Sequence, residues 1–569
     1  MTSNWVLLNK KKNIKEISQK FGLTPLTSVI LCNRDIYNEE DIRLQLSSDL
    51  NDLLSPSLLP DIDKASVLLK DYIENKKNIR IVGDYDIDGV CATYILYKSI
   101  SDIGGMVSFA IPDRINDGYG INISIIDKAI EDKIDLIITC DNGIAAEEQI
   151  KYAKENGIKV IVTDHHDISE FPISAEAVID PKRTDSKYLF KDICGAVVAW
   201  KFITYFYDKY KNEFLKDSKY IIDKYLDFAM LATIGDIMPL INENHIIAKL
   251  GLEKIIFTEN KGLKKLLDVS GINYLEKGLT AYHIGFIIGP LINAAGRMES
   301  ASTALKLFLS NNEKEINELA YILKNFNDER KKITEEGTKL AIEKIENEYK
   351  NDKVLVVFVE GLLEQVAGIV AGRIKEKYNK PTIILADTKD TNIAKASCRS
   401  IEVYDIFENL NKHNDMLLTF GGHKLAAGFS IDKKDIDELR LLLNKESNLE
   451  EKDFVRKVQI DAEFPLNEIN EELILDIEKL EPYGQNFSKP TFAVKNVLTE
   501  ITNVYGDSKN IIKLLFDSNG FKIKGILFGD YEELNSYLNK NKDLDILYYP
   551  KINEYRGNRS IEINMLDYR

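Results

Sequence analysis

The chain has 569 residues, of which 44% are hydrophobic and 29% are charged, and its formal net charge is −16 with an isoelectric point near 5.2. This length predicts about three or four domains instead of one hydrophobic core. The acidic balance excludes a protein that coats duplex nucleic acid through a broad basic face, although a local basic groove could still hold a strand.

The N-terminus and the cysteines predict a cytoplasmic protein with reduced thiols. No apolar run reaches the roughly 18 residues of a membrane span, so we expect no membrane contact. The N-terminal stretch MTSNWVLLNKKK has its charges after a short apolar patch, which is the reverse of a secretory signal. The five cysteines are scattered and include no CxxC pair, which argues against disulfides and a structural zinc site.

Residues 60–260 alternate short apolar runs with amphipathic helical stretches. The predicted strands are IRIVGDYDIDG, MVSFAIPDR, KIDLIITCDNGI and IKVIVTDHHDI. Helices are predicted from Val90 to Ser101, from Ala145 to Gly157, and through most of the stretch from Cys194 to Glu259. The alternation predicts a parallel sheet covered on both faces, with ligands at the carboxyl ends of its strands.

The second half of the chain contains three further predicted parts. Residues 311–350 form a charged helical pattern with few breakers, which predicts a solvated helix joining two globular parts. The segments KVLVVFVEG, VAGIVAGRIKEKY and PTIILA predict a second α/β unit. From about Lys452, the short runs FAVKNVLTEI, NIIKLLF and KIKGILFG predict a small β-barrel or sandwich.

Three carboxylates follow the first predicted strand. Asp84, Asp86 and Asp88 lie at i, i+2 and i+4, so they face one side if the backbone stays extended there. Converging carboxylates repel one another, and a divalent cation would relieve that repulsion. The alternative is an ordinary polar turn with Gly89 as its hinge.

Further acidic and histidine residues end other predicted elements. Asp141 follows the third strand, and the alternative for it is a helix cap. The fourth strand is followed by Asp164, His165 and His166, for which the alternative is a polar turn. Asp236 follows a predicted helix, and the alternative for it is a helix C-terminal turn. Together they form an oxygen and nitrogen donor set that favours Mg²⁺ or Mn²⁺, with the imidazole favouring Mn²⁺. Bridging carboxylates suggest two ions, which can clamp a phosphoryl group and generate hydroxide. The residues therefore predict metal-assisted hydrolysis of a phosphate ester or anhydride.

The motifs as a set resemble those of the DHH phosphoesterases. DYDIDG, TCDNGI, VTDHH and GDIMPL match the four metal-site motifs of that superfamily in order, and GPLINAAGRM matches the end of its first catalytic domain. AGIVAGRI, KASCRS and FGGHKLAAGF match a DHHA1-type second domain, and EPYGQNFSKPTF resembles the entry to an OB-fold region. The resemblance covers nearly the whole chain and is greatest to the exonucleases specific for single-stranded DNA.

The resemblance implies roles for the residues of the metal-site motifs. The implied metal ligands are Asp84, Asp86, Asp88, Asp141, His165 and Asp236, with Asp84 either a ligand or an outer partner. His166 would contact the scissile phosphate or help to activate water, and the implied catalytic residues are His166, Asp141, Asp86 and Asp88. The implied cofactors are two divalent ions, Mn²⁺ or Mg²⁺.

The resemblance also implies four residues that hold substrate phosphates. Arg297, Arg399 and His423 would bind phosphates of the strand, and Arg114 would contact the 5′-terminal phosphate. The alternatives are that Arg297 caps the helix before it and that the glycine pair preceding His423 simply forms a turn.

The chain departs from the usual family pattern at three positions. Val82 stands where many relatives carry a histidine, so one potential metal ligand is absent. Leu291 stands where an arginine is usual, which removes one candidate phosphate contact, and around Leu363 the usual Trp-His pair is missing.

The resemblance implies an α/β architecture of several domains. We expect an N-terminal extension over 1–60, a parallel-sheet DHH domain over 61–310, a long connecting helix over 311–350, a DHHA1-type α/β domain over 351–450 and an OB-like nucleic-acid-binding β domain over 451–569. Within the last domain, the residues expected to contact bases or the strand are Phe487, Lys489, Phe492 and Lys495. For each aromatic residue, the alternative is barrel core.

The implied function is a 5′-to-3′ exonuclease specific for single-stranded DNA that releases 5′-mononucleotides in DNA repair and recombination. A narrow cleft between the two α/β parts would exclude duplexes. Besides single-stranded DNA, a single-strand-binding protein and a helicase are possible partners, and we expect a monomer. One alternative is a DHH phosphodiesterase acting on oligoribonucleotides or cyclic dinucleotides. The other, of a different class, is a catalytically silent replication scaffold.

Overall fold

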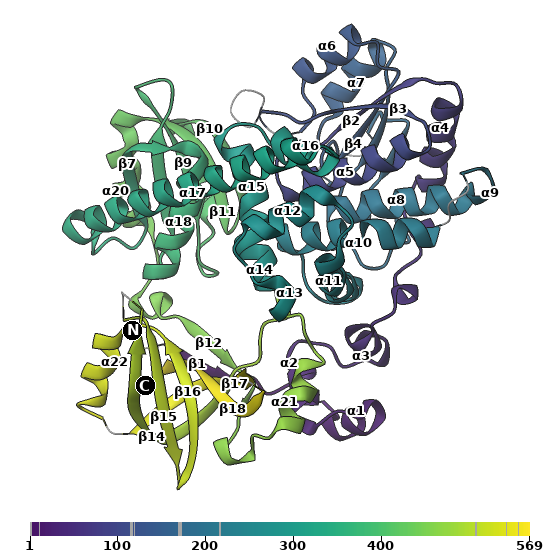
Figure 1. The fold of residues 1–569 in the computed structure, drawn as a ribbon. Coiled ribbons are helices and arrows are strands. Elements are labelled where there is room, and N and C mark those ends of the chain that lie inside the picture. The colour runs from purple at the N-terminus through teal and green to yellow at the C-terminus, as the bar shows by residue number, and fades with distance from the viewer. Residues whose placement is uncertain are drawn as a thin grey trace. The chain divides into compact units, whose positions relative to one another are not determined.

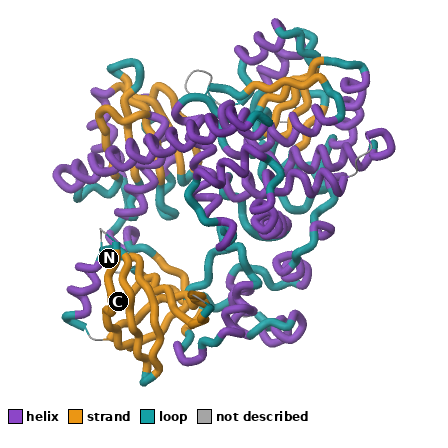
Figure 2. The backbone as a smooth tube through the Cα atoms, in the orientation of Figure 1, coloured by secondary structure: helices purple, strands orange, loops and turns teal. Residues whose placement is uncertain are grey.

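The computed structural model describes residues 3–10, 12–113, 118, 120–168, 173–214, 218–506, 509–541, 543–555 and 557–569. The chain divides into two compact units (Figure 1). Unit 1 consists of Met1–Leu53, Ile237–Leu250 and Lys457–Arg569, and unit 2 consists of Leu54–Asp236 and Gly251–Arg456. Figure 2 shows the strands of the large sheets in orange among the helices.

Unit 2 begins with the predicted parallel sheet. Its five strands have the order β3-β2-β4-β5-β6, and every neighbouring pair is parallel. The strands are β2 (Asn78–Val82), β3 (Met106–Ala110), β4 (Leu136–Cys140), β5 (Lys159–Thr163) and β6 (Ala177–Ile179). All residues of β4 are buried, as expected for a central strand covered on both faces. The sequence did not predict β6, because three residues are too short for a periodic signal.

Helices cover both faces of this sheet (Figure 1). Buried side chains of α6 and α7 pack on one face, and α4, α5 and α8 cover the other. The helices are α4 (Ile62–Glu74), α5 (Ile87–Asp102), α6 (Ile123–Glu131), α7 (Glu147–Glu155), α8 (Gly195–Lys209), α9 (Lys211–Phe214), α10 (Ser218–Gly235), α11 (Glu243–Lys254), α12 (Lys261–Val269), α13 (Tyr274–Lys277), α14 (Ala281–His283), α15 (Gly289–Met298) and α16 (Ser302–Leu309). A π-helical turn, Ile284–Ile288, joins α14 to α15.

The long helix α17 (Glu313–Lys344) is less solvated than predicted. It has a continuous buried stripe at helical spacing, consisting of Ile316, Ala320, Leu323, Asn327, Thr334, Gly337 and Ala341. This stripe packs against α12, α15 and α16 and then against α18 and β7. The charged pattern therefore describes only the outer face of a helix that is part of both cores.

The second α/β part of unit 2 has a mixed sheet of order β10-β11-β9-β8-β7. Only the β7–β8 pair is parallel. The strands are β7 (Leu355–Leu363), β8 (Thr382–Asp387), β9 (Ile393–Arg399), β10 (Leu417–His423) and β11 (Ala426–Asp432), and the helices are α18 (Glu364–Tyr378), α19 (Ile406–Asn411) and α20 (Ile436–Glu446). The predicted strand–helix–strand segment is confirmed as β7, α18 and β8.

Unit 1 contains the predicted barrel. Five strands pair in the order β14-β15-β16-β18-β17, and the β14–β17 pair closes the ring. The strands of the unit are β1 (Asn4–Leu7), β12 (Lys457–Ile460), β13 (Ala462–Glu463), β14 (Phe492–Tyr505), β15 (Ile511–Ser518), β16 (Phe521–Phe528), β17 (Asp543–Tyr555) and β18 (Asn558–Tyr568). The helices are α1 (Ile14–Phe21), α2 (Pro25–Asn33), α3 (Glu39–Leu46), α21 (Glu471–Glu478) and α22 (Tyr531–Leu538). Because β1 pairs with β12, the two ends of the chain fold together.

Two predictions from composition can be compared with the fold. All five cysteines are buried free thiols, which confirms the absence of disulfides. Within the described part of the chain, no helix combines the length and the apolar character needed to cross a membrane.

Candidate metal centre

The first acidic motif lies where β2 turns into α5. Asp86 is the N-cap of α5, and its Oδ1 accepts hydrogen bonds from the backbone amides of Asp88 at 2.9 Å and Gly89 at 3.2 Å. The backbone is therefore helical from Ile87 onward, and the predicted extended spacing of the three carboxylates is wrong. The helix instead begins at the site, so that its N-terminal amides lie beside the carboxylates.

Asp88 is fully buried and is held by a second helix. Its carboxylate accepts hydrogen bonds from the backbone amides of Gly195 and Ala196, both at 2.7 Å. These two residues begin α8, where the backbone amides have no partner within the helix. The start of α8 therefore orients the Asp88 carboxylate.

Asp141 follows the central strand β4 directly and has a backbone φ of 60°. A Cβ atom added to Gly195 would lie 2.7 Å from the Asp141 Cβ, which is closer than real contacts allow. The glycine at position 195 therefore lets α8 approach Asp141 closely while its amide binds Asp88.

We predict that Gly195→Ala lowers the turnover number by about a hundredfold, because a side chain there must displace Asp141 by a fraction of an ångström or more. Steady-state hydrolysis of a single-stranded oligonucleotide measures this. The control is Gly372→Ala in α18, where an added Cβ meets no atom within 4 Å. Equal turnover in the two variants would contradict the prediction.

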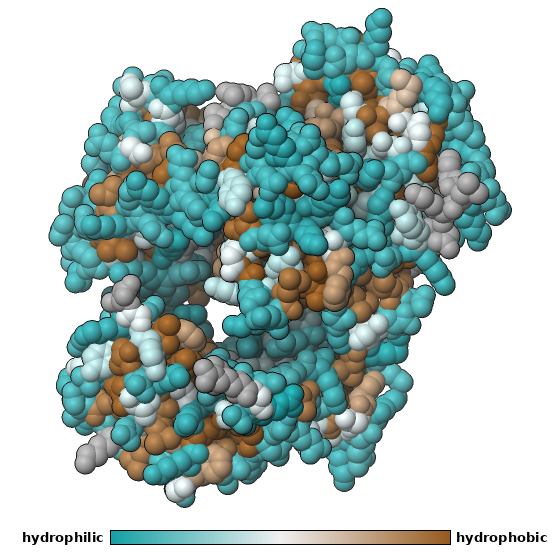
Figure 3. All heavy atoms as spheres, in the orientation of Figure 1, coloured by the Kyte–Doolittle hydropathy of each residue, from teal (hydrophilic) through white to brown (hydrophobic). Residues whose placement is uncertain are grey.

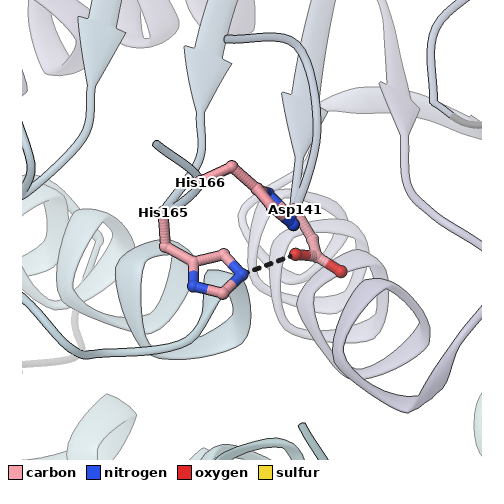
Figure 4. A group of neighbouring side chains, drawn as sticks. All are labelled: Asp141, His165 and His166. Atoms are coloured by element: carbon pink, nitrogen blue, oxygen red, sulfur yellow. Dashed lines mark hydrogen bonds and ion pairs between the residues drawn. The ribbon is translucent and has the colours of Figure 1, made fainter. Parts of the chain in front are cut away.

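The two histidines follow strand β5 and have different environments. The His165 ring is buried, and its Nε2 lies 3.1 Å from Asp141 Oδ1, 3.5 Å from Asp88 Oδ2 and 3.7 Å from Asp236 Oδ2. Figure 4 shows the His165 ring directed at the Asp141 carboxylate. The His166 side chain is 45% exposed, and its Nδ1 lies 2.7 Å from Asp164 Oδ1.

Asp236 enters the site from the end of α10. Its backbone amide still donates to the carbonyl of Ala232 at 2.8 Å, and the next residue, Ile237, has a φ of 58° that ends the helix. The Asp236 carboxylate therefore projects from a helix C-terminus toward His165.

The structure brings all six predicted ligands together, and we call these residues the acidic cluster. Their potential ligand atoms form overlapping groups, in each of which all atoms lie within 4.8 Å of one another. The groups are Asp84, Asp86 and Asp141; Asp88, His165 and Asp236; and Asp141, His165 and His166. His166, which was predicted to be catalytic, thus lies at the edge of the cluster.

The charges of the acidic cluster are poorly balanced by the protein alone. Burial, followed by repulsion from Asp88 and Asp86, raises the pKa of Asp141 well above its usual value. The same causes raise the pKa of Asp236 to about 8. A divalent cation would remove this penalty, because it supplies the positive charge that the site lacks. The donor set of carboxylate oxygens and one imidazole fits Mn²⁺ or Mg²⁺.

We predict that the apparent affinity of the metal-free protein for Mn²⁺ rises as the pH increases through about 8. Below that pH, each ion must displace protons from Asp141 and Asp236, whose pKa values are raised. Isothermal titration calorimetry at about pH 6, 7 and 8.5 measures this. In Asp236→Asn the rise should be smaller, and an affinity that does not change with pH would contradict the prediction.

At His166 the surroundings favour the charged form of the side chain, whereas at Asp141 and Asp236 they disfavour it. Burial opposes its protonation, but the hydrogen bond and charge of Asp164 raise the pKa of His166 to about 9. Asp164 is itself fixed, since its Oδ2 accepts the Ile144 backbone amide at 2.9 Å. At neutral pH, His166 is therefore a protonated and partly exposed group that can donate to a phosphoryl oxygen.

The predicted phosphate-binding residues are not members of the acidic cluster. Arg297, at the end of α15, donates from Nη1 to the Gln365 carbonyl at 2.8 Å, and Arg399, at the end of β9, donates to the Cys398 carbonyl at 2.8 Å. His423 is exposed at the end of β10. Arg114 lies outside the described residues. Their phosphate-binding roles stay predictions.

Two of the three departures from the family pattern are buried. Val82 and Leu291 are both buried, so each is part of the core, and neither side chain offers a ligand atom. Leu363 is exposed at the end of β7.

Sequence reasoning missed two acidic residues beside the site. The resemblance implies no separate role for Asp164, although its carboxylate holds His166. Asp180 follows β6, where burial raises its pKa to about 7 and the Lys182 backbone amide donates to it at 2.7 Å. An apolar run ending in aspartate, AVID, is the same signal as at the other strands, but it is short.

The residues of the C-terminal part that were expected to contact bases or the strand are buried or already have partners within the protein. Phe487 and Phe492 are both 0% exposed, so the prediction that they stack on bases is wrong. The alternative of barrel core holds for Phe492 in β14, whereas Phe487 is buried against Tyr483 and His245 before that strand. Lys489 lies over the ring of Tyr549 at 3.7 Å, and Lys495 pairs with Glu463 at 3.0 Å.

Family models match three segments of the chain. The model described as "DHH family, N-terminal domain" matches residues 78–233, "DHHA1 domain" matches 351–448, and "RecJ OB domain" matches 460–567. The chain is 32% identical over 556 residues to the single-stranded-DNA-specific exonuclease RecJ of Bacillus subtilis strain 168, covering 97% of this chain and 69% of that protein. It is also 32% identical over 561 residues to the RecJ of Haemophilus influenzae, covering 96% of each.

Solved structures match along the whole chain. The crystal structure of RecJ from Thermus thermophilus in complex with Mn²⁺ superposes with a TM-score of 0.83 at 25% identity, covering 100% of this chain and 79% of that one. The structure of the same protein with Mg²⁺ gives a TM-score of 0.77 at 25% identity, with 100% and 78% coverage. The predicted order of α/β domains and barrel is confirmed by these matches.

Proposed function

The chain belongs to the RecJ family of single-stranded-DNA-specific exonucleases, and we propose that it cuts single-stranded DNA from the 5′ end at the acidic cluster. It is a metal-dependent hydrolase of phosphodiester bonds, and its cofactors are Mn²⁺ or Mg²⁺. The observation that carries the assignment of the site is the convergence of six donor residues from four places in the chain, the β2–α5 turn and the ends of β4, β5 and α10, in one largely buried cluster.

The residues of the acidic cluster would hold two divalent ions. Asp141 would be a central ligand, because it belongs to two of the three groups of potential ligand atoms. When bound, such ions stabilise negative charge on phosphoryl oxygens and lower the pKa of water. His165 would serve as a neutral imidazole ligand, since burial lowers its pKa.

His166 would act on the scissile phosphate. Its protonated ring can donate from Nε2 to a phosphoryl oxygen, while Asp164 keeps Nδ1 engaged and so fixes the orientation of the ring. Arg297, Arg399 and His423 would bind phosphates of the strand, and Arg114 would bind the 5′-terminal phosphate. Guanidinium groups suit that role because they form paired hydrogen bonds to phosphate oxygens.

The finer biological assignments are part of the same proposal. We propose release of 5′-mononucleotides, a role in DNA repair and recombination in the cytoplasm, a monomeric state, and a single-strand-binding protein and a helicase as partners. Within the chain, the proposed domain limits are 1–60, 61–310, 311–350, 351–450 and 451–569.

Two alternatives are less well supported. A phosphodiesterase for dinucleotides has no need of the C-terminal barrel, which here occupies most of residues 457–569. A catalytically silent scaffold would not need an intact set of ligands, and here all six predicted positions carry donor side chains that lie together.

One experiment separates these functions. Oligonucleotides labelled at the 5′ or the 3′ end, single-stranded or duplex, are incubated with the purified protein in Mn²⁺ or in EDTA. We expect mononucleotides to be released from the 5′ end of the single strand only, and only with Mn²⁺. Release from the 3′ end, equal cleavage of duplexes, cleavage of dinucleotides alone or no cleavage would each contradict the proposal.

A further inference from the structure

An exposed pair of aromatic rings lies in the stretch that leads to α15. Tyr282 is 63% exposed and Phe286 is 68% exposed. Their rings are stacked, with centroids 4.9 Å apart and an interplanar angle of 23°. Figure 3 shows hydrophobic surface in the region of α13 and α14. Large exposed apolar groups that lie together commonly mark a binding surface.

The local backbone holds both rings outward. Thr280 and His283 form a capping box at the start of α14, in which the Thr280 backbone amide donates to His283 Nδ1 at 3.1 Å. Ile284 and Ile288 are both fully buried and anchor the π-helical turn that follows. Phe286 lies between these two anchors, and its ring is on the solvent side. π-Helical turns of this kind are frequent at functional sites.

The helical stretch that carries the pair continues directly into the wall of the metal site. A Cβ atom at Gly289 would lie 3.6 Å from the side chain of Ile87, which stands between Asp86 and Asp88. Farther along α15, a Cβ atom at Gly296 would lie 2.5 Å from the Tyr85 carbonyl. Phe286 precedes Gly289 by three residues, which is about one helical turn of 5 Å. The stretch that carries the ring pair is therefore continuous with a helix whose backbone packs against Tyr85 and Ile87 of the first acidic motif.

We propose that Tyr282 and Phe286 form a stacking platform for unpaired bases of the single strand next to the cleavage site. This inference rests on the proposed function. An unpaired base has a free face that can stack on an aromatic ring, and such stacking tolerates any base. A base in a duplex has both faces covered by its neighbours, so the platform favours single strands over duplexes. It supplies the base contacts that the buried Phe487 and Phe492 cannot make.

Abasic scanning tests this platform. Binding of oligothymidylate strands is measured in EDTA, each strand lacking one base at a different position from the 5′ end. We expect the wild-type protein to bind about tenfold more weakly when one or two particular bases near the 5′ end are missing. The double variant Tyr282→Ala/Phe286→Ala should bind the intact strand about tenfold more weakly and should be insensitive to those same bases.

Two further variants act as controls. Phe257→Ala removes an aromatic side chain of unit 2 that is 76% exposed, and it should bind all strands like the wild-type protein. Tyr282→Phe keeps the ring and should retain the abasic profile of the wild-type protein. In steady-state cleavage with Mn²⁺, the double variant should raise KM for a long strand more than it lowers kcat.

The outcomes separate this inference from the proposed function. If the wild-type protein cleaves single strands but the double variant keeps the wild-type affinity or the wild-type abasic profile, the platform is wrong and the rings have another occupant, such as a protein surface. If the wild-type protein cleaves no single strand in Mn²⁺, the proposed function itself is wrong.

Discussion

Replacing Asp141 by asparagine is expected to lower metal-dependent hydrolysis of single-stranded DNA by about a thousandfold or more. Asp141 is shared by two groups of potential ligand atoms and lies 3.1 Å from His165. An asparagine keeps the shape of the side chain but removes the charge that attracts a divalent ion. Single-turnover cleavage of a 5′-labelled strand at saturating Mn²⁺ measures the loss.

The fold of the Asp141→Asn variant should be intact without metal. The raised pKa of Asp141 means that its ionisation opposes folding, so the stability contributed by its protonated form is lost as pH rises through that pKa. The metal-free variant should therefore melt no lower than the metal-free wild-type protein at neutral pH. Its melting temperature should also respond much less to added Mn²⁺.

Asp227→Asn is a matched control for this variant. Asp227 is 2% exposed against 3% for Asp141, burial raises its pKa to about 6, and it accepts a hydrogen bond from Thr258 at 2.6 Å. It is not a member of the acidic cluster, so this variant should keep its activity. Cleavage by Asp141→Asn within tenfold of the wild-type rate, or equal losses in both variants, would be incompatible with the proposed site.

The second large effect concerns the His166–Asp164 pair. His166→Ala is expected to lower kcat by about a hundredfold to a thousandfold, because it removes a positioned donor to the phosphate. Asp164→Asn should lower the pKa of His166 from about 9 toward its ordinary 6.5, since the opposing charge is lost. The cleavage rate of both proteins should fall as the pH rises and His166 loses its proton. In Asp164→Asn this fall should occur at a pH up to about two units lower than in the wild-type protein.

NMR titration of the metal-free protein measures the histidine directly. The raised pKa means that the pair stabilises the wild-type fold fully below about pH 6.5 and loses this contribution as pH rises through about 9. His413→Ala is the control, because the His413 ring pairs with Glu446 in the second α/β part of unit 2. The cleavage rate of this variant should equal that of the wild-type protein. A His166 pKa that is the same with and without Asp164 would rule out the coupling.

The convergence of the acidic cluster was predictable because of the topology of parallel sheets. Asp84, Asp141 and His165 each follow a strand of one parallel sheet, and the carboxyl ends of such strands meet at one edge. Asp236 was a weaker candidate in the sequence, since it comes from a helix C-terminus and not from the end of a strand of this sheet. Its position depends on how α10 packs on α5 and α8, which no local pattern encodes.

Other features could not be read from local sequence because they depend on contacts between distant residues. The β1–β12 pair joins residues more than 400 positions apart. Phe487 and Phe492 look like exposed aromatics beside lysines in the sequence, but tertiary packing buries them completely. Tyr282 and Phe286 show the reverse, since an apolar helical pattern does not reveal which rings stay in solvent.

The most direct test of the acidic cluster is anomalous diffraction at the manganese edge from crystals grown with Mn²⁺. We expect two peaks among the carboxylates and His165 of the cluster, both within coordination distance of Asp141. No peak at the cluster, or manganese bound only elsewhere on the chain, would contradict the account.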